Sequence, residues 1–369
     1  MSASFDVIVV GGGPAGASTA RILANSGFSV LLLEKADRYR YKPCAGGLSV
    51  KVLPYLPDGY GGVVERKLNR LVVHFDDRHL EFVYDKPVVY TVSRQRFDQF
   101  LRDKAEENGA DVRYREKFSG VVEKDGLVEV VTDRDRYVGR YLVGADGYPS
   151  AVGRAVGIGY GYKTKIVALE CEVPAKGEWM DAIHLFLFDG ILGYGWIFPK
   201  RDTMALGVGA TISSSKRELH NYLFKLFSIA GIGYVKPAGY VYPVGPNYRN
   251  RISRGGVFLV GDAAGIADPF SGEGIYYAIK SAQIVSSYVM SPFGSIENRF
   301  KKEIFNKQRR GKVLSFVFYK FFRYVFNQPM FEEKGKNALR RFLEDGDFYY
   351  SVHFPWSRVL SAFLKGVKR

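Results

Sequence analysis

The sequence has 369 residues, of which 47% are apolar, and this length exceeds what one hydrophobic core usually spans, so we expect two or more subdomains. The composition excludes a disordered chain, and two cysteines exclude a disulfide framework or a cysteine-ligated metal cluster and fit a reducing cytoplasm. The net charge of +15 fits either a protein from a hot environment or contact with an anionic membrane, whereas nucleic acid is disfavoured because no basic block is interleaved with aromatic residues.

The chain opens with the pattern of a dinucleotide-binding fold. An apolar run over residues 5–10 predicts a strand, and it leads straight into glycines without the basic region or cleavage site of a signal peptide. Apolar residues at helical spacing follow from Ala15, Gly27 is the expected C-cap, and the run FSVLLLE predicts a second strand that ends at Glu34. Between the first strand and the helix, a G-x-G-x-x-G motif is formed by Gly11, Gly13 and Gly16.

This order of elements suits a dinucleotide. The first glycine permits a sharp turn, the second lets the backbone approach a pyrophosphate, and the third lets the helix pack on the strand. The helix N-terminus attracts phosphates, and Glu34 can accept hydrogen bonds from ribose hydroxyls while repelling a 2′-phosphate. We therefore expect FAD or NAD rather than NADP, with cofactor-binding residues Gly11, Gly13, Pro14, Ala15, Gly16, Glu34 and Lys35.

The middle of the chain alternates between strand patterns and one clear helix. Strands of a mostly antiparallel sheet are predicted by the alternating runs at 68–77, 79–85, 165–173 and 182–188. The stretch SRQRFDQFL at 93–101 predicts a helix with Ser93 as its N-cap and a core-facing side formed by Phe97, Phe100 and Leu101.

Two further strands end in glycine and aspartate. The strand within 140–154 leads into GADG with Asp146, and a strand at 257–260 leads to Asp262. An aspartate at a strand tip suits a polyol such as ribitol, although GADG also fits a hairpin turn and Asp262 a plain helix N-cap. A second helix start, whose dipole would face the pyrimidine edge of a reduced flavin, is expected at Gly272, Gly274 and Ile275.

These three motifs together resemble the FAD-binding fold of the para-hydroxybenzoate hydroxylase group. GGGPAG with Glu34, GADG at 144–147 and GDAAG at 261–265 carry the resemblance, which spans residues 5 to about 290. The group includes aromatic hydroxylases, halogenases, squalene epoxidase, electron-transfer-flavoprotein dehydrogenases and geranylgeranyl reductases. The resemblance implies FAD as the cofactor and a role in binding it for Asp146, for Asp262 on the ribityl chain, and for Arg96 or alternatively Arg94.

The stretch YGWIFPK at 194–200, followed by Gly207 and Gly209, indicates which members of that group this sequence resembles most. It resembles the Y-x-W-x-F-P-K…G-x-G motif of archaeal geranylgeranyl reductases. Alternate residues of a strand share one face, so Tyr194, Trp196 and Phe198 would form an apolar wall for a polyisoprenoid chain. From the residues alone, an ordinary sheet-packing core explains these aromatic residues equally well, and the resemblance favours the wall.

The segment KPCAGGLS at 42–49 is similar to one that lies beside the flavin in the same reductases. The resemblance implies that Cys44, Ala45 and Gly46 contact the cofactor and that Gly47, with Pro269 later in the chain, contacts the substrate. Cys44 would donate a proton to the carbon skeleton or tune the flavin, although a small buried apolar residue beside the ring is an equal alternative. A disulfide between Cys44 and Cys171 is disfavoured.

The expected fold is α/β, with a Rossmann-like FAD-binding domain, an inserted, mostly antiparallel substrate-binding sheet and a helical C-terminal region. The FAD-binding domain is assigned to 1–50, 94–155 and 251–290, the substrate domain to 51–93 and 156–250, and the C-terminal region to 291–369. No apolar run is long enough to span a bilayer, and the basic aromatic segment at 313–326 is either an interfacial helix or a buried one.

The resemblance implies a flavin-dependent reductase that saturates C=C bonds of geranylgeranyl lipid precursors, in which reduced FAD gives hydride and a protein group gives the proton. Cys44, His184 and Tyr194 are the candidate proton donors, and no metal is expected. No second G-x-G-x-x-G appears, so the electron donor is expected to be separate: a ferredoxin, a reduced deazaflavin or NAD(P)H. An FAD-dependent monooxygenase or epoxidase, and a non-catalytic flavin-containing lipid carrier, are the alternatives.

Overall fold

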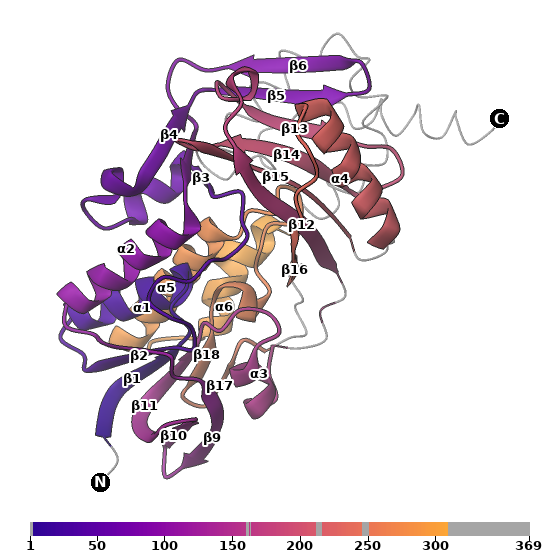
Figure 1. Cartoon of the computed structure of the whole chain (residues 1–369). Coiled ribbons are helices and arrows are strands. Elements are labelled where there is room, and N and C mark those ends of the chain that lie inside the picture. Colours follow the sequence, from indigo (N-terminus) through magenta and orange to yellow (C-terminus); the bar gives the residue numbers. More distant parts are fainter. Residues whose placement is uncertain (1–2, 160–161, 163, 212–215, 246–250, 309–369) are drawn as a thin grey trace.

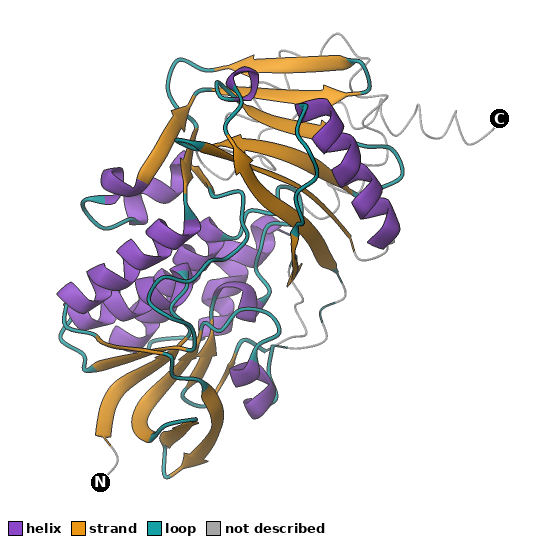
Figure 2. Ribbon diagram, in the orientation of Figure 1, coloured by secondary structure: helices purple, strands orange, loops and turns teal. Residues whose placement is uncertain are grey.

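The computed structural model describes residues 3–159, 162, 164–211, 216–245 and 251–308, and these form two large sheets with helices between them (Figure 1). The expected α/β fold class is confirmed. Figure 2 shows helices in the space between the two sheets and a further helix on the outer side of the second sheet. The helices are α1 (Pro14–Asn25), α2 (Arg94–Glu107), α3 (Ala151–Val156), α4 (Lys216–Ala230), α5 (Ile275–Met290) and α6 (Ile296–Phe300).

The first sheet has eight strands and a parallel centre. Its order is β17-β18-β11-β1-β2-β8, and the hairpin of β9 and β10 joins it at β11. All five residues of β2 are buried, because helices and strands cover it on both sides, and this explains its unbroken apolar run. The strands are β1 (Ala3–Val10), β2 (Val30–Glu34), β8 (Asp111–Tyr114), β9 (Phe118–Lys124), β10 (Leu127–Thr132), β11 (Arg136–Gly144), β17 (Ser253–Arg254) and β18 (Val257–Leu259).

The second sheet has seven strands in the order β16-β12-β15-β14-β13-β5-β6. All its pairings are antiparallel except that of β13 with β5. The four runs predicted as strands all fall within it, as β5, β6, β12 and β13. Its strands are β5 (Arg70–Phe75), β6 (Arg78–Val83), β12 (Lys165–Pro174), β13 (Ile183–Leu187), β14 (Gly193–Pro199), β15 (Thr203–Thr211) and β16 (Ala238–Pro243).

The second sheet has a different partner on each face. On the outer face, apolar residues of β12, β14 and β15 pack against α4. On the inner face, a second cluster joins β5, β6 and β13 to a small three-stranded sheet in the order β3-β7-β4. The small sheet consists of β3 (Gly47–Ser49), β4 (Val64–Leu68) and β7 (Val89–Val92), and its Thr91 hydroxyl donates a hydrogen bond of 2.7 Å to the Pro199 carbonyl.

Several local expectations have clear outcomes. Helix α2 begins directly after Ser93, which is the N-cap, although its side chain makes no capping hydrogen bond. Phe97 and Leu101 are fully buried on the core side of this helix. No helix in the described part of the chain is long and apolar enough to cross a membrane. The segment 313–326 lies outside the described residues.

Candidate active site

Two glycines of the first motif are required by the fold itself. Gly11 has φ +106°, and a Cβ there would lie 2.4 Å from the Ala145 carbonyl oxygen. A Cβ on Gly16 would lie 1.9 Å from the carbonyl oxygen of Gly11, which is a severe clash with backbone. These positions therefore let β1, α1 and the end of β11 approach one another closely.

Gly13 is different, because neither its backbone conformation nor a neighbouring atom requires a glycine at this position. Its backbone is extended, with φ −76° and ψ −176°, and a Cβ there would approach only the Arg40 guanidinium, at 3.4 Å. Helix α1 begins immediately afterwards, and no side chain caps its first N–H groups. This open cradle, which a Cβ would partly fill, fits the pyrophosphate of a dinucleotide.

Glu34 ends β2 and is buried beside this cradle. Its carboxylate accepts hydrogen bonds of 2.9 Å from the backbone N–H of Gly12 and of Ala36, and Arg40 Nε lies 3.3 Å away. Lys35, by contrast, is exposed. The carboxylate thus braces the glycine turn in this structure, and its expected contact with a ribose stays a prediction.

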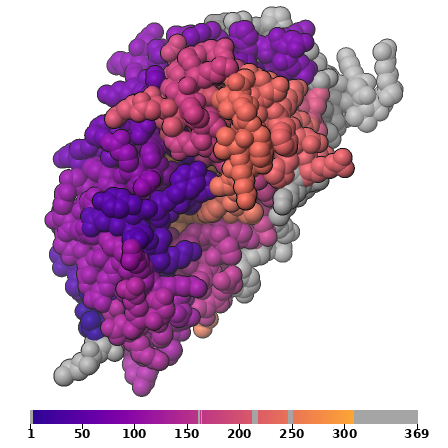
Figure 3. Space-filling view, viewed as in Figure 1, coloured from indigo at the N-terminus to yellow at the C-terminus, as the bar shows by residue number. Residues whose placement is uncertain are grey.

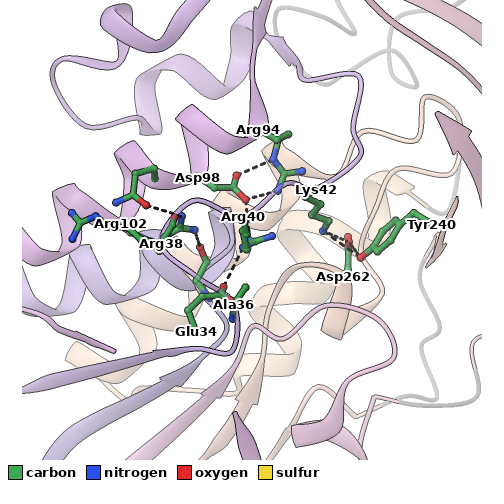
Figure 4. A network of polar contacts seen from close by, with 12 residues as sticks. Glu34, Ala36, Arg38, Arg40, Lys42, Arg94, Asp98, Arg102, Tyr240 and Asp262 are labelled. Atoms are coloured by element: carbon green, nitrogen blue, oxygen red, sulfur yellow. Dashed lines mark hydrogen bonds and ion pairs between the residues drawn. The ribbon is translucent and has the colours of Figure 1, made fainter. Parts of the chain in front are cut away.

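A buried polar network that the sequence analysis missed continues from Glu34 (Figure 4). Arg94 holds the Asp98 carboxylate with two hydrogen bonds of 2.8 and 2.9 Å, and Arg40 reaches the same carboxylate at 3.0 Å. Burial alone would raise the pKa of Asp98, but the adjacent Arg94 guanidinium lowers the pKa below its ordinary value. The i,i+4 spacing of an arginine and an aspartate on one helix was the available signal.

Arg102 is the fully buried member of this network. It donates to the carbonyl oxygen of Gly12 at 2.8 Å and to that of Arg38 at 2.7 Å, so it joins the glycine turn after β1 to the loop after β2. Arg96, which the sequence analysis placed at the cofactor, lies elsewhere: its side chain is 48% exposed, 3.5 Å from Glu65. Arg94, the alternative, is the arginine that points into the network.

Asp146 also differs from expectation. Its carboxylate accepts hydrogen bonds from the Ser150 hydroxyl at 2.7 Å and from the backbone N–H of Ala151 and Val152 at 2.6 and 3.1 Å. The side chain therefore caps α3 and is turned away from the first motif, because N–H groups at a helix start are the nearest strong donors. The Cα atom of Asp146 would lie 2.9 Å from a Cβ on Gly11, so its backbone borders the glycine turn.

Asp262 lies in the short 3-10 helix η4 (Gly261–Ala264) and joins three distant segments. Its carboxylate accepts a 3.0 Å hydrogen bond from the Tyr240 hydroxyl of β16, and Lys42 Nζ lies 3.7 Å from the same oxygen. In Figure 3 the indigo surface of the loop after β2 meets the orange surface of β16, where Lys42 and Tyr240 are 3.3 Å apart. The predicted aspartate therefore lies where both sheets meet.

The loop from Gly265 to Gly274 brings the second helix start to the same place. Asp268 is fully buried and accepts hydrogen bonds from the backbone N–H of Phe270 at 2.9 Å and of Ser271 at 2.8 Å, which shapes the turn beside the half-buried Pro269. Gly272 has φ +69°, and α5 begins after Gly274 with no side-chain cap. The first backbone N–H groups of α5 are therefore available to a ligand, like those at the start of α1.

Buried side chains around this loop fix its position. Tyr194 donates a hydrogen bond to the carbonyl oxygen of Ser271, and a Cβ on Gly272 would lie 2.8 Å from the hydroxyl of Tyr242. Glu273 is not a solvated acid, because it pairs with the buried Lys51 at 2.5 Å. Tyr242, like Tyr240, was missed, although the alternation in the stretch GYVYP was a signal that both tyrosines face one side.

Trp196 and Tyr194 share the inner face of β14, with ring centroids 5.8 Å apart. Gly207 and Gly209 lie directly opposite them on β15. A Cβ on Gly207 would be 2.5 Å from the Trp196 ring, so the G-x-G pair provides the space in which the indole lies. The third aromatic residue, Phe198, lies against Gly47, where a Cβ would be 2.5 Å from its ring.

Cys44 lies between the two halves of the site. It lies beside the Arg94 guanidinium and beside the carboxyl of Glu170 on β12. Gly46 follows with φ +72°, where a Cβ would strike the carbonyl oxygen of Val92 at 2.1 Å. Cys44 and Cys171 are both free thiols, and Cys171 is buried on the opposite face of β12 from Glu170.

Of the three candidate proton donors, His184 lies away from this site. Its ring nitrogen Nδ1 is 3.0 Å from Nε2 of His74, and the pair packs with Trp179 and Phe186. The strand register places His184 opposite Ile197, on the other face of the sheet from Trp196. Burial lowers the pKa of His184 to about 4, so the ring is neutral at pH 7.

Comparison with known proteins identifies relatives over most of the chain. A family model described as an FAD binding domain matches residues 4–186. The chain is 31% identical to an uncharacterized protein of Methanosarcina barkeri over 86% of this chain and 84% of the relative. It is also 31% identical to the digeranylgeranylglycerophospholipid reductase of Thermoplasma volcanium, over 75% of this chain and 76% of that protein.

A solved structure shows the same fold. The geranylgeranyl bacteriochlorophyll reductase-like protein of Thermoplasma acidophilum superposes with a TM-score of 0.78 at 22% identity, covering 99% of this chain and all of the other. The relatives at 30% identity or more identify the chain as a member of the geranylgeranyl reductase family of FAD-dependent flavoenzymes.

Proposed function

We propose that this protein saturates C=C bonds in the geranylgeranyl chains of membrane lipid precursors. The observation that carries the proposal is the position of the Trp196 and Tyr194 wall: Tyr194 hydrogen-bonds the very loop that leads into the uncapped start of α5. A prenyl chain has no polar groups along its length, so it is recognised by an apolar aromatic surface. The names of two relatives, a geranylgeranyl diphosphate reductase and a digeranylgeranylglycerophospholipid reductase, support the same class of substrate.

The residues present fit FAD, and each part of it has a proposed partner. The cradle at Gly13 and α1 takes the pyrophosphate, Glu34 the adenosine ribose, and Asp262 the ribityl chain. The start of α5 faces the pyrimidine edge, and the segment from Cys44 to Gly46 lies beside the ring system. When bound and reduced, FAD supplies the hydride for the reaction.

The protein's own side chains hold the substrate and exclude water. Burial raises the pKa of Tyr194 well above its ordinary value, and its hydroxyl proton is committed to the Ser271 carbonyl. We therefore assign Tyr194 to the wall and to holding the loop, in preference to proton donation. A separate reductant, such as a ferredoxin, a reduced deazaflavin or NAD(P)H, is proposed to deliver electrons, and the net charge of +15 supports peripheral contact with an anionic membrane.

The test is a single-turnover reduction without air. The holoprotein is reduced with dithionite and mixed with digeranylgeranylglycerophospholipid or geranylgeranyl diphosphate, and mass spectrometry follows products heavier by two hydrogens per saturated bond. No such product would overturn the proposal, whereas oxygen-dependent hydroxylation or epoxidation would establish the monooxygenase alternative.

Two tryptophan variants locate the substrate wall. Trp196→Ala should lower prenyl turnover while FAD remains bound, because the ring lies on the substrate face of the sheet. Trp179→Ala is the matched control, since this indole packs with His184 away from the wall. Loss of FAD from Trp196→Ala, or equal losses of turnover in both variants, would show that the wall is misplaced.

A further inference from the structure

Glu170 is a buried carboxyl group on the substrate face that the fold alone does not explain. The register of three neighbouring strands aligns Glu170 of β12, Gly207 of β15 and Trp196 of β14 in one row. Because Gly207 has no side chain, the carboxyl and the indole meet across it, and Trp196 Nε1 donates to Glu170 Oε2 at 3.2 Å. Only 5% of the Glu170 surface is exposed.

The same carboxyl also contacts the segment assigned to the flavin. The Cys44 backbone lies beside the Glu170 carboxyl, so the acid lies between the Cys44 segment and the aromatic wall. The Trp196 indole and the Cys44 backbone are both neutral, and neither is an ion-pair partner. The buried Lys200, which is the nearest cation, forms its ion pair with Glu172 at 3.2 Å instead.

This environment favours the neutral acid. Burial raises the pKa of Glu170 to about 7, against the opposing effects of Lys200 and of the two neutral groups. Titratable groups surround Glu170 on several elements. They are Cys171 and Glu172 on its own strand, Tyr41 and Cys44 on the segment after β2, Tyr242 on β16, and Lys200 directly after β14. Among these, Lys200 is the one cation, and it is shared with Glu172.

We propose that Glu170, in its protonated form, donates the proton that completes saturation of the prenyl C=C bond at the wall formed by Trp196. This inference rests on the proposed function. One alkene carbon forms a C–H bond with hydride from the reduced flavin, and the other forms a C–H bond with the Glu170 proton. The alkene is reduced by two electrons, the flavin is oxidised, and the carboxylate that remains takes a proton from water before the next turnover.

A measurement that needs no turnover tests the state of the acid. Infrared spectra of the flavin-free protein, recorded between pH 5 and 9, should show a protonated carboxyl band that titrates near pH 7. The band should be absent from Glu170→Gln and present in Glu178→Gln, a control at an exposed glutamate that pairs with Lys176 on the surface. A Glu170 carboxyl that is already ionised at pH 6 would overturn the proposal.

Turnover by the same variants then tests the donation itself. Glu170→Gln keeps an acceptor for Trp196 but has no proton to give, so prenyl saturation should fall about 10²- to 10⁴-fold, with normal FAD absorbance. The wild-type rate should decline above pH 7. Glu170→Asp should recover part of the activity that Glu170→Gln loses, whereas Glu178→Gln should behave as wild type. Wild-type rate and pH profile in Glu170→Gln would overturn proton donation alone, whereas no saturated product from the wild type would overturn both proposals.

Discussion

At the scale of single residues, the contact between Gly47 and Phe198 shows why the segment after Cys44 contains two glycines. Gly46 needs its positive φ, but Gly47 has an ordinary backbone and is small because the Phe198 ring occupies the space of a Cβ. The pair joins the small sheet to the second sheet at the aromatic wall. Sequence patterns indicated both residues as substrate contacts, but the direct contact between them is visible only in three dimensions.

Gly47→Ala should therefore disturb both stability and turnover. The added methyl group would lie 2.5 Å from the Phe198 ring, and such overpacking typically costs about 1–3 kcal/mol of unfolding free energy. Thermal unfolding and prenyl turnover measure the two effects. Gly61→Ala is the matched control, because nothing lies within 4 Å of a Cβ there. Equal stability of the two variants would contradict the close packing of Gly47.

Glu170 gives a second prediction, on the pH dependence of stability. An acid whose pKa rises from 4.5 to about 7 on folding stabilises the folded state below pH 4.5 relative to higher pH, and this advantage is lost as the pH rises through 7. Glu170→Gln mimics the neutral acid, so it should match the wild type at pH 4.5 and be more stable at pH 8, by up to about 3 kcal/mol. Denaturant unfolding at both pH values measures this difference, and a constant difference would contradict it.

Some residue roles were beyond the reach of sequence patterns for a common reason. Glu170 lies in a strand whose alternation predicts only that it faces away from Leu169, and its partner Trp196 arrives on another strand. Arg96 and Asp146 each fit a motif, but the Arg96 side chain lies near Glu65 and the Asp146 side chain caps α3, so their expected cofactor contacts stay predictions.

At the scale of elements, the β1–α1–β2 unit was fully predictable because each signal is local. The apolar run, the glycines, the helical spacing and the acid at the strand tip all occur within residues 5–34. The second sheet was predictable only strand by strand. Its order joins β5 to β13, which are more than a hundred residues apart, and no local pattern specifies the parallel register Leu71 to Ile183.

Within the β1–α1–β2 unit, Gly13 is the glycine that we expect the ligand to require, whereas Gly11 and Gly16 are required by the fold. Gly13→Ala should leave the flavin-free protein stable to within about 1 kcal/mol, because its Cβ meets only the end of Arg40. The same variant should bind FAD about tenfold or more weakly, since the methyl group enters the pyrophosphate cradle. Fluorescence titration with FAD measures the affinity.

Gly16→Ala is the informative comparison for this prediction. Its Cβ would strike the Gly11 carbonyl oxygen at 1.9 Å, so it should destabilise the flavin-free protein itself by about 3 kcal/mol or more. If Gly13→Ala instead unfolded the flavin-free protein as severely, Gly13 would be a structural glycine and the cradle would be wrongly assigned.

At the scale of the whole molecule, segments of the two large sheets alternate along the chain, so no single position in the sequence divides one sheet from the other. The first sheet uses residues 3–34, 111–144 and 253–259, and the second uses 70–83, 165–211 and 238–243. Buried polar contacts then tie the two halves together, including the ion pair of Lys51 with Glu273 and the hydrogen bond of Tyr240 to Asp262. Unfolding either half would therefore break strand connections and buried contacts of the other.

This interleaving predicts that the described fold melts as one unit and that FAD stabilises all of it. Calorimetry should show a single transition for the flavin-free protein, and FAD at 100 times its dissociation constant should stabilise the folded state by about 2.7 kcal/mol. The whole transition should move to higher temperature. The proposed FAD contacts are α1, Glu34 and Asp262, and in the sequence they come both before and after the strands of the second sheet. Gly13→Ala should lose most of this shift at the same FAD concentration. Two separate transitions, of which only one responds to FAD, would show that the sheets fold independently and that the cofactor is held by one of them alone.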